Sequence, residues 1–76
     1  MSLKPLPARK VIKVLSILDF KIVRKRGSPV VLKHPDGRIT VVPAHAAEKI
    51  GPGLLLKIIK DAKLTKEEFL KLLENV

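Results

Sequence analysis

Apolar and polar positions follow a helical period near the start of the chain. The apolar side chains recur three and four residues apart, at Val11, Val14, Leu15 and Leu18. This spacing puts them on one face of a helix and predicts a helix over residues 7–18. Pro7 suits the first turn of that helix, because the N–H group it lacks would have no partner there. Arg9, Lys10 and Lys13 fall mostly outside the apolar stripe, so the exposed face is expected to be basic.

The period then changes to two, which is typical of strands. From Phe20 the side chains alternate until Gly27 breaks the run, and this predicts a first strand. A second strand is predicted over 30–34 and a third over 38–42. The sequence Pro35-Asp36-Gly37 between them forms a tight turn readily. We therefore expect a three-stranded antiparallel sheet.

Two further helices are predicted after the sheet. Residues 44–51 are expected to form a loop, and the apolar positions that follow have helical spacing and predict a helix over 52–62. Thr65 and Glu68 have the spacing of a capping box and open a short third helix. The expected order is one helix, three strands and two helices.

This order predicts the α+β fold class, with a three-stranded sheet covered by helices on one face. An α-β-β-β-α order is that of the double-stranded-RNA-binding fold. The third helix is an addition at the C-terminal end and is expected to pack beside the second helix. No linker or internal repeat interrupts the pattern, so we expect residues 1–76 to form a single domain.

The composition excludes several classes of protein. The chain has 76 residues and no cysteine, which excludes disulfide scaffolds, zinc fingers and thiol nucleophiles. A chain of this size has too little interior for an enclosed cleft, so any site must be a shallow surface feature. Lysines interrupt every apolar stretch, and we expect no membrane span and a cytoplasmic location. No phosphate loop or dinucleotide fingerprint occurs, and we expect no cofactor.

The net charge of +9 is the strongest functional signal in the composition. A small domain with this charge attracts polyanions, so nucleic acid is the expected partner. A solvated basic surface and docking on an acidic protein are the alternatives. Residues 24–28, which precede the second predicted strand, combine guanidinium groups with flexible backbone N–H groups, and this combination suits phosphate binding. The candidate RNA-binding residues are Lys10, Arg24, Lys25, Arg26, Gly27, Ser28, Lys57 and Lys60.

The histidines and aromatic residues narrow the chemistry further. Imidazole is a side chain that can move protons near neutral pH, so His34 and His45 are the candidate catalytic residues, with a structural role as the alternative for each. No acidic residue or cysteine stands at a ligand spacing from them, so we expect no metal site. Phe20 and Phe69, the only aromatic residues, lie on apolar faces and are expected in the core. Recognition would then rest on phosphates and 2′-hydroxyl groups.

Several segments together resemble the HicA-type mRNA interferase toxins of prokaryotic toxin-antitoxin modules. The matching pieces are Phe20 and residues 24–28, 34–38, 41–45 and 53–62, and the first helix and residues 65–69 also fit. The resemblance implies a fold like that of double-stranded-RNA-binding domains and ribosome-independent cleavage of mRNA. It also implies a HicB-type antitoxin that covers the active site.

The chain departs from this family at the position that carries the chemistry. The family has a catalytic histidine after the Gly-Ser that precedes the second strand, and a second histidine often follows it. Here these positions hold Pro29 and Val30, and proline can neither take up nor donate a proton. In one hypothesis, the chain is an endoribonuclease in which His34 or His45 has taken over proton transfer. In the other, it is a module of the same fold that binds RNA or an antitoxin without cleavage. DNA binding is disfavoured, because no helix presents a convincing array of base-reading side chains.

Overall fold

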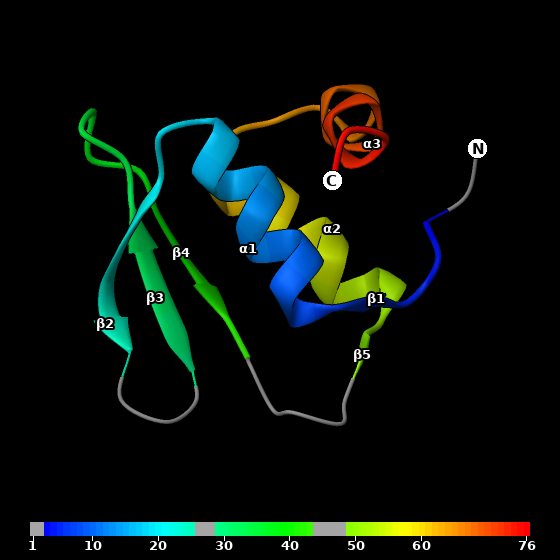
Figure 1. Cartoon of the computed structure of the whole chain (residues 1–76), viewed down its shortest axis with the longest axis horizontal. Helices are drawn as coiled ribbons and strands as arrows, with labels where there is room; N and C mark the ends of the chain where they lie inside the picture. The colour runs from blue at the N-terminus through cyan, green and yellow to red at the C-terminus, as the bar shows by residue number, and fades with distance from the viewer. Residues whose placement is uncertain (1–2, 26–28, 44–48) are drawn as a thin grey trace.

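The computed structural model describes residues 3–25, 29–43 and 49–76. Within these ranges a three-stranded sheet lies beside three helices (Figure 1). The elements are β1 (Leu6–Pro7), α1 (Ala8–Ile17), β2 (Lys21–Lys25), β3 (Val30–Lys33), β4 (Ile39–Val42), β5 (Lys49–Ile50), α2 (Pro52–Asp61) and α3 (Lys66–Leu73). The predicted α+β class, the antiparallel sheet and the extra C-terminal helix are confirmed. None of the helices in the described ranges has the length and apolar character needed to cross a bilayer.

The sheet is an antiparallel meander in the order β2-β3-β4. Its register pairs Val30 with Val42 and Leu32 with Thr40, and all four side chains are buried. Figure 1 shows α1 and α2 on one side of the sheet, and we call the face toward them the inner face. Since side chains alternate along a strand, the intervening residues of β3 and β4 point to the opposite, outer face.

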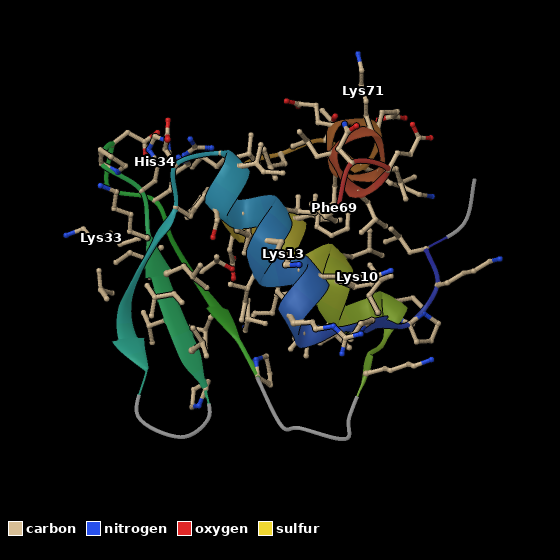
Figure 2. The ribbon with its side chains drawn as sticks, in the orientation of Figure 1. Lys10, Lys13, Lys33, His34, Phe69 and Lys71 are labelled. Carbon is tan, nitrogen blue, oxygen red and sulfur yellow. The ribbon has the colours of Figure 1, made fainter. Side chains whose placement is uncertain are left out.

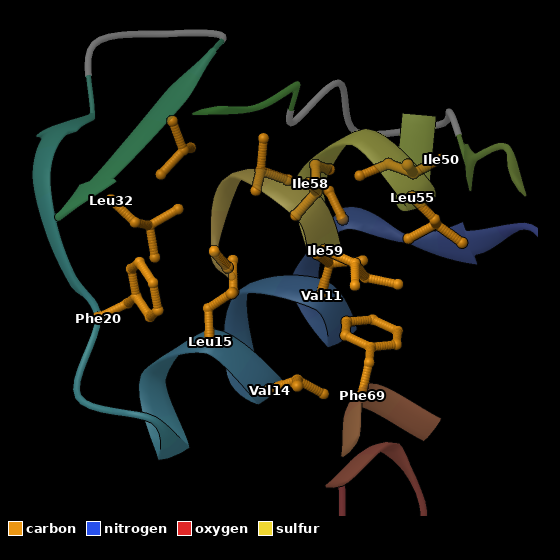
Figure 3. Packing of buried hydrophobic residues seen from close by; sticks show 14 residues of the cluster. Val11, Val14, Leu15, Phe20, Leu32, Ile50, Leu55, Ile58, Ile59 and Phe69 are labelled. Carbon is orange, nitrogen blue, oxygen red and sulfur yellow. The ribbon is translucent and has the colours of Figure 1, made fainter. Parts of the chain in front are cut away.

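The core lies between the inner face and the two central helices (Figure 3). The helices contribute apolar side chains at the predicted spacing, namely Val11, Val14 and Leu15 from α1 and Leu55, Ile58 and Ile59 from α2. Phe20 and Phe69 are buried, as predicted. Burying one such large apolar side chain stabilises a fold by roughly 1.5–3 kcal/mol. Packing of this kind stabilises the fold of a chain that has no cysteine.

Helices α1 and α2 end in the same way, and these ends direct core side chains. In each case the two backbone N–H groups after the C-cap donate to carbonyl oxygens of the last turn, at 3.0 or 3.1 Å. This is the Schellman pattern, in which the residue after the C-cap adopts a left-handed conformation. Asp19 has a φ of 71° and Lys63 a φ of 56°. The turn at the end of α1 carries Phe20 into the core, and the turn at the end of α2 does the same for the half-buried Leu64.

α3 completes the core on the side of the helices away from the sheet. The capping box predicted at its start is present: Glu68 N donates to Thr65 Oγ1 and Thr65 N donates to Glu68 Oε1, both at 3.1 Å. Phe69 in the first turns is fully buried. The helix contacts both α1 and α2. The prediction that it packs beside the second helix is confirmed, and α1 provides a second contact surface.

The pairing of β1 with β5 is a feature that the sequence does not predict. Leu6 lies opposite Ile50 and Pro7 opposite Lys49, in antiparallel register. The expectation of a loop over 44–51 is therefore wrong at its last residues before α2. A strand of two residues has no detectable period, and its partner is remote in the sequence. The pairing ties the segment that leads into α1 to the segment that leads into α2.

Candidate functional site

The lysines expected to bind RNA lie on the two central helices. Lys57 and Lys60 are exposed on α2 and, being three residues apart, share one face of that helix. Lys10 is partly buried on α1, where Lys13 follows it one turn later (Figure 2). Ammonium groups on flexible stems at such positions can contact phosphate oxygens without reading a base sequence.

The basic run expected to hold phosphates begins at the end of a strand. Arg24 and Lys25 are the last two residues of β2, opposite Val31 and Val30 of β3. Arg26, Gly27 and Ser28 lie outside the described residues, and so does His45. The described backbone therefore places only the start of the predicted phosphate-binding segment, at the end of the sheet where β2 leads into β3.

Positions 29 and 30, which hold histidines in the toxins that this chain resembles, differ from each other in their surroundings. Pro29 is exposed immediately before β3. Val30 is only 2% exposed and packs in the core, opposite Val42 in the register. A side chain at position 30 therefore faces the helices, whereas one at position 29 is in contact with solvent. Of the two, only position 29 is accessible to a ligand, and its proline has no proton to transfer.

His34 lies at the opposite end of β3. It is five positions after Pro29 in the sequence, which corresponds to roughly 16 Å along a strand. The His34 side chain is 18% exposed, and its ring packs edge-on against Phe20 with 5.2 Å between ring centroids. Figure 2 shows His34 at the turn between β3 and β4, near the end of α1. It cannot occupy the place of a side chain at position 29.

The turn that contains His34 has the geometry expected of its sequence. The N–H of Gly37 donates to the His34 carbonyl oxygen at 2.9 Å, and Gly37 has a φ of 101°, a conformation that a residue with a Cβ rarely adopts. The N–H of Asp36 lies 3.1 Å from His34 Nδ1, and Asp36 Oδ1 lies 2.9 Å from the same atom. An N–H donor needs an unprotonated Nδ1 and a carboxylate needs a protonated one, so the two contacts cannot both be hydrogen bonds in the same tautomer or charge state of the ring.

Asp36 is also bound by Arg38, two residues along the chain. The backbone N–H of Arg38 donates to Asp36 Oδ1 at 3.0 Å, and Arg38 Nε donates to Asp36 Oδ2 at 2.8 Å. The backbone N–H of Arg38, followed by the positive charges of Arg38 and His34, holds the pKa of Asp36 below its ordinary value. His34, Asp36 and Arg38 form what we call the turn cluster. The sequence leaves a structural role as the alternative to catalysis for His34, and its contacts within the turn cluster are of this structural kind.

Arg38 connects the turn cluster to the helices. Its Nη1 donates to the carbonyl oxygen of Ala62, the C-cap residue of α2, at 2.6 Å, and its guanidinium lies 5.2 Å from the ring centroid of Phe20. Local sequence patterns do not reveal this role, since the partner is 24 residues away. The one local signal is the position of an arginine directly after a Pro-Asp-Gly turn.

A second group of cationic side chains lies on the outer face of the sheet. Lys21 of β2 is directly opposite Lys33 of β3 in the register. Together with Val23, His34 and Pro35 these lysines line a shallow depression. Figure 2 shows Lys33 extending away from the helices. Neither lysine is among the candidates from sequence, because isolated lysines in a basic chain carry no motif.

The described part of the chain offers phosphate-binding groups and no metal-binding cluster. No set of three or more His, Cys, Asp or Glu side chains in the described ranges is arranged to hold a metal ion. The cationic groups are exposed on α2, on α1 and on the outer face, while the one described histidine takes part in the turn cluster. This arrangement suits binding of a polyanion by charge.

Comparison with known families identifies one match. The model of the HicA toxin of bacterial toxin-antitoxin systems matches residues 8–64, about three quarters of the chain. The match covers α1, the three-stranded sheet and α2, and it ends before α3. The comparison with curated proteins gave no match.

Proposed function

Because the chain belongs to the HicA family of toxins from bacterial toxin-antitoxin modules, we propose that it binds RNA through its basic surface without cleaving it at the position that the family uses. Family membership implies a module with an antitoxin partner. RNA, bound at its phosphates, is the ligand that the charge distribution favours.

Charge is the first support for RNA binding. The chain carries 16 lysine and arginine residues against 7 acidic ones. Lys57 and Lys60 are exposed on one face of α2, and Lys10 lies on α1. Arg24 and Lys25 lead into Arg26, Gly27 and Ser28, which we include in the proposed interface on the sequence pattern alone. Binding at phosphates fits a protein whose two phenylalanine side chains are both buried, because neither of these rings is exposed for base stacking.

The observation that supports a loss of cleavage is the environment of positions 29 and 30. RNA cleavage without a metal ion needs a group that removes the 2′-hydroxyl proton or protonates the leaving 5′-oxygen, each worth roughly 10²–10⁴-fold in rate. Pro29 is exposed but has no titratable group, and Val30 is buried in the core. Neither residue can transfer a proton, and we therefore propose that binding persists here without cleavage.

A second candidate function is RNA cleavage by a histidine elsewhere in the chain. The contact of 2.9 Å between His34 Nδ1 and Asp36 Oδ1 favours it, since a carboxylate that orients an imidazole leaves Nε2 for proton transfer. A mRNA endoribonuclease of this kind would use His34, or His45, as its catalytic residue. The packing of the His34 ring against Phe20 makes this the weaker of the two proposals.

A salt series of RNA affinities tests the proposed binding. Fluorescence anisotropy with a labelled, structured RNA should give a steep fall in affinity with salt, and the variant Lys57→Glu/Lys60→Glu should bind at least ~10-fold more weakly with a shallower slope. The control with the same change in net charge is Lys66→Glu/Lys71→Glu, on the exposed side of α3. RNA affinity that is independent of salt, or equal losses in the two double variants, would refute the proposed surface.

A further inference from the structure

The outer face of the sheet combines an apolar strip with two lysines. Val23 of β2 is 59% exposed, and Ile39 and Val41 of β4 are 52% and 42% exposed. Val31 lies between them, opposite Val41 in the register. Val23 shares a surface depression with Lys21 and Lys33, which puts it on this same face. The outer face is defined here as these six residues: Lys21, Val23, Val31, Lys33, Ile39 and Val41.

The helices leave this face open. α1 and α2 both pack against β4 from the inner side, and α3 packs against the two helices rather than the sheet (Figure 1). None of the elements in the described ranges covers the opposite side. Val23, Ile39 and Val41 are exposed on this face and Val31 between them is half-buried, and exposed apolar surface of this kind marks interaction sites on proteins.

The two lysines on the outer face form a pair of like charges. Lys21 and Lys33 are direct cross-strand neighbours, an arrangement that destabilises a sheet. Within residues 3–25, 29–43 and 49–76 the salt bridges involve only Asp36, so neither lysine is neutralised there by a carboxylate. A single anionic group between the two ammonium groups would relieve the repulsion. The face is therefore complementary to a surface that carries an acidic side chain beside apolar ones.

We propose that the outer face is the surface on which the antitoxin of the module docks, through a patch that carries an acidic side chain beside apolar ones. An antitoxin carboxylate lies between Lys21 and Lys33, and antitoxin apolar side chains cover Val23, Ile39 and Val41. This inference rests on family membership and on the outer face itself. Its test does not require the chain to bind RNA.

The chemistry of the face favours an acidic protein over the other occupants. RNA bases stack on aromatic rings, and the apolar residues of the outer face are all valine or isoleucine. A second copy of the chain would bring four lysines and two molecules of charge +9 together, and these like charges repel each other. An acidic partner neutralises the lysines and removes the apolar strip from water in a single contact.

Two variants of the chain, measured against the purified antitoxin encoded in the same module, test the proposal. Lys33→Glu reverses one charge of the pair, and Ile39→Lys puts a charge into the apolar strip. Both should weaken antitoxin binding at least ~10-fold in calorimetric titrations. Lys71→Glu on α3 is the control for the charge change. Leu56→Lys on α2 is the control for the apolar one, since Leu56 is 50% exposed.

Lys33→Glu also separates docking from folding. It replaces a repulsive cross-strand pair by an attractive one, so the isolated variant should be at least as stable to urea as the unaltered chain. A variant that gains stability and loses its partner cannot owe the loss to unfolding. Its RNA affinity should fall no further than that of Lys71→Glu, because the two share the same change in net charge.

Three results would overturn the proposal. Antitoxin affinity that is unchanged in both outer-face variants, or no complex with the unaltered chain, would exclude this docking surface. RNA affinity that falls well below that of Lys71→Glu would assign the face to nucleic acid. A dimer of the isolated chain that Ile39→Lys converts to a monomer would assign it to self-association. If the unaltered chain does not bind RNA but the two outer-face variants lose antitoxin binding, the proposed function is refuted and the docking surface is supported.

Discussion

Arg38 reaches from the turn between β3 and β4 to the C-cap residue of α2, where its Nη1 donates to Ala62 O at 2.6 Å. The same side chain binds the Asp36 carboxylate and lies against the Phe20 ring. A cation at the C-terminal end of a helix also interacts favourably with the helix dipole. One residue thus joins the sheet to the helical layer at the end remote from Pro29.

Substitution of Arg38 should therefore destabilise the fold. Arg38→Ala removes hydrogen bonds from a charged donor, and we expect it to lower the free energy of unfolding by about 2 kcal/mol in urea denaturation. Arg9→Ala, at an exposed position of α1, is the control and should change it by less than about 0.5 kcal/mol. Equal effects of the two substitutions would contradict the bridging role of Arg38.

The turn cluster should make stability depend on pH in the acid range. The pKa of Asp36 in the fold lies below its ordinary value of 3.8. Its ionised form therefore stabilises the fold fully above the unfolded-state pKa, and this contribution is lost as the pH falls through the lower folded-state pKa. Between about pH 5 and 2 the unaltered chain should lose more stability than Asp36→Asn. Urea midpoints across this pH range measure the loss of stability, and equal losses in the unaltered chain and in Asp36→Asn would contradict the prediction.

The ends of α1 and α2 should respond differently to glycine. Lys63 has a left-handed backbone that costs a residue with a Cβ roughly 1 kcal/mol, and Lys63→Gly should raise the free energy of unfolding by about 0.5–1 kcal/mol. Asp19→Gly should raise it less, because aspartate tolerates this conformation better than lysine. Thermal melting of both variants makes the comparison. A loss of stability in Lys63→Gly would be inconsistent with the Schellman geometry.

Thr40 offers a route to a more stable core. Its side chain is 1% exposed on the inner face, and its hydroxyl has no hydrogen-bond partner among the described residues. Thr40→Val has nearly the same shape and removes the unsatisfied group, so it should raise the free energy of unfolding by about 1 kcal/mol. The reverse change on the same strand, Val42→Thr, should lower it. Chemical denaturation that shows Thr40→Val to be less stable would mean that the hydroxyl has a partner.

The elements that sequence predicts correctly are those built on local patterns. The helical spacing around Leu15, the Pro35-Asp36-Gly37 turn and the capping box of Thr65 each involve neighbours within a few residues, and the structure contains all three. These signals fix the order of the elements and the inner face of the sheet. The burial of Phe20 and Phe69 follows from the same patterns.

The features that sequence does not predict depend on contacts between distant residues. The bond from Arg38 to Ala62 and the pairing of Leu6 with Ile50 join segments with no common period. The Lys21–Lys33 pair depends on the strand register, which the β-bulge between Ile22 and Arg24 shifts. In the candidate site the sequence identifies Pro29 as the departure, but only the fold shows Val30 in the core and His34 at the far end of β3.

The most direct test of RNA binding without cleavage is to incubate the purified chain with mixed-sequence RNA in excess chelator, beside the variant Pro29→His. We expect the unaltered chain to bind the RNA and leave it intact, and Pro29→His to cleave it, because the variant supplies the missing proton-transfer group at the exposed position. Cleavage by the unaltered chain that is abolished by His34→Ala or by His45→Ala would contradict this account and establish a relocated catalytic histidine.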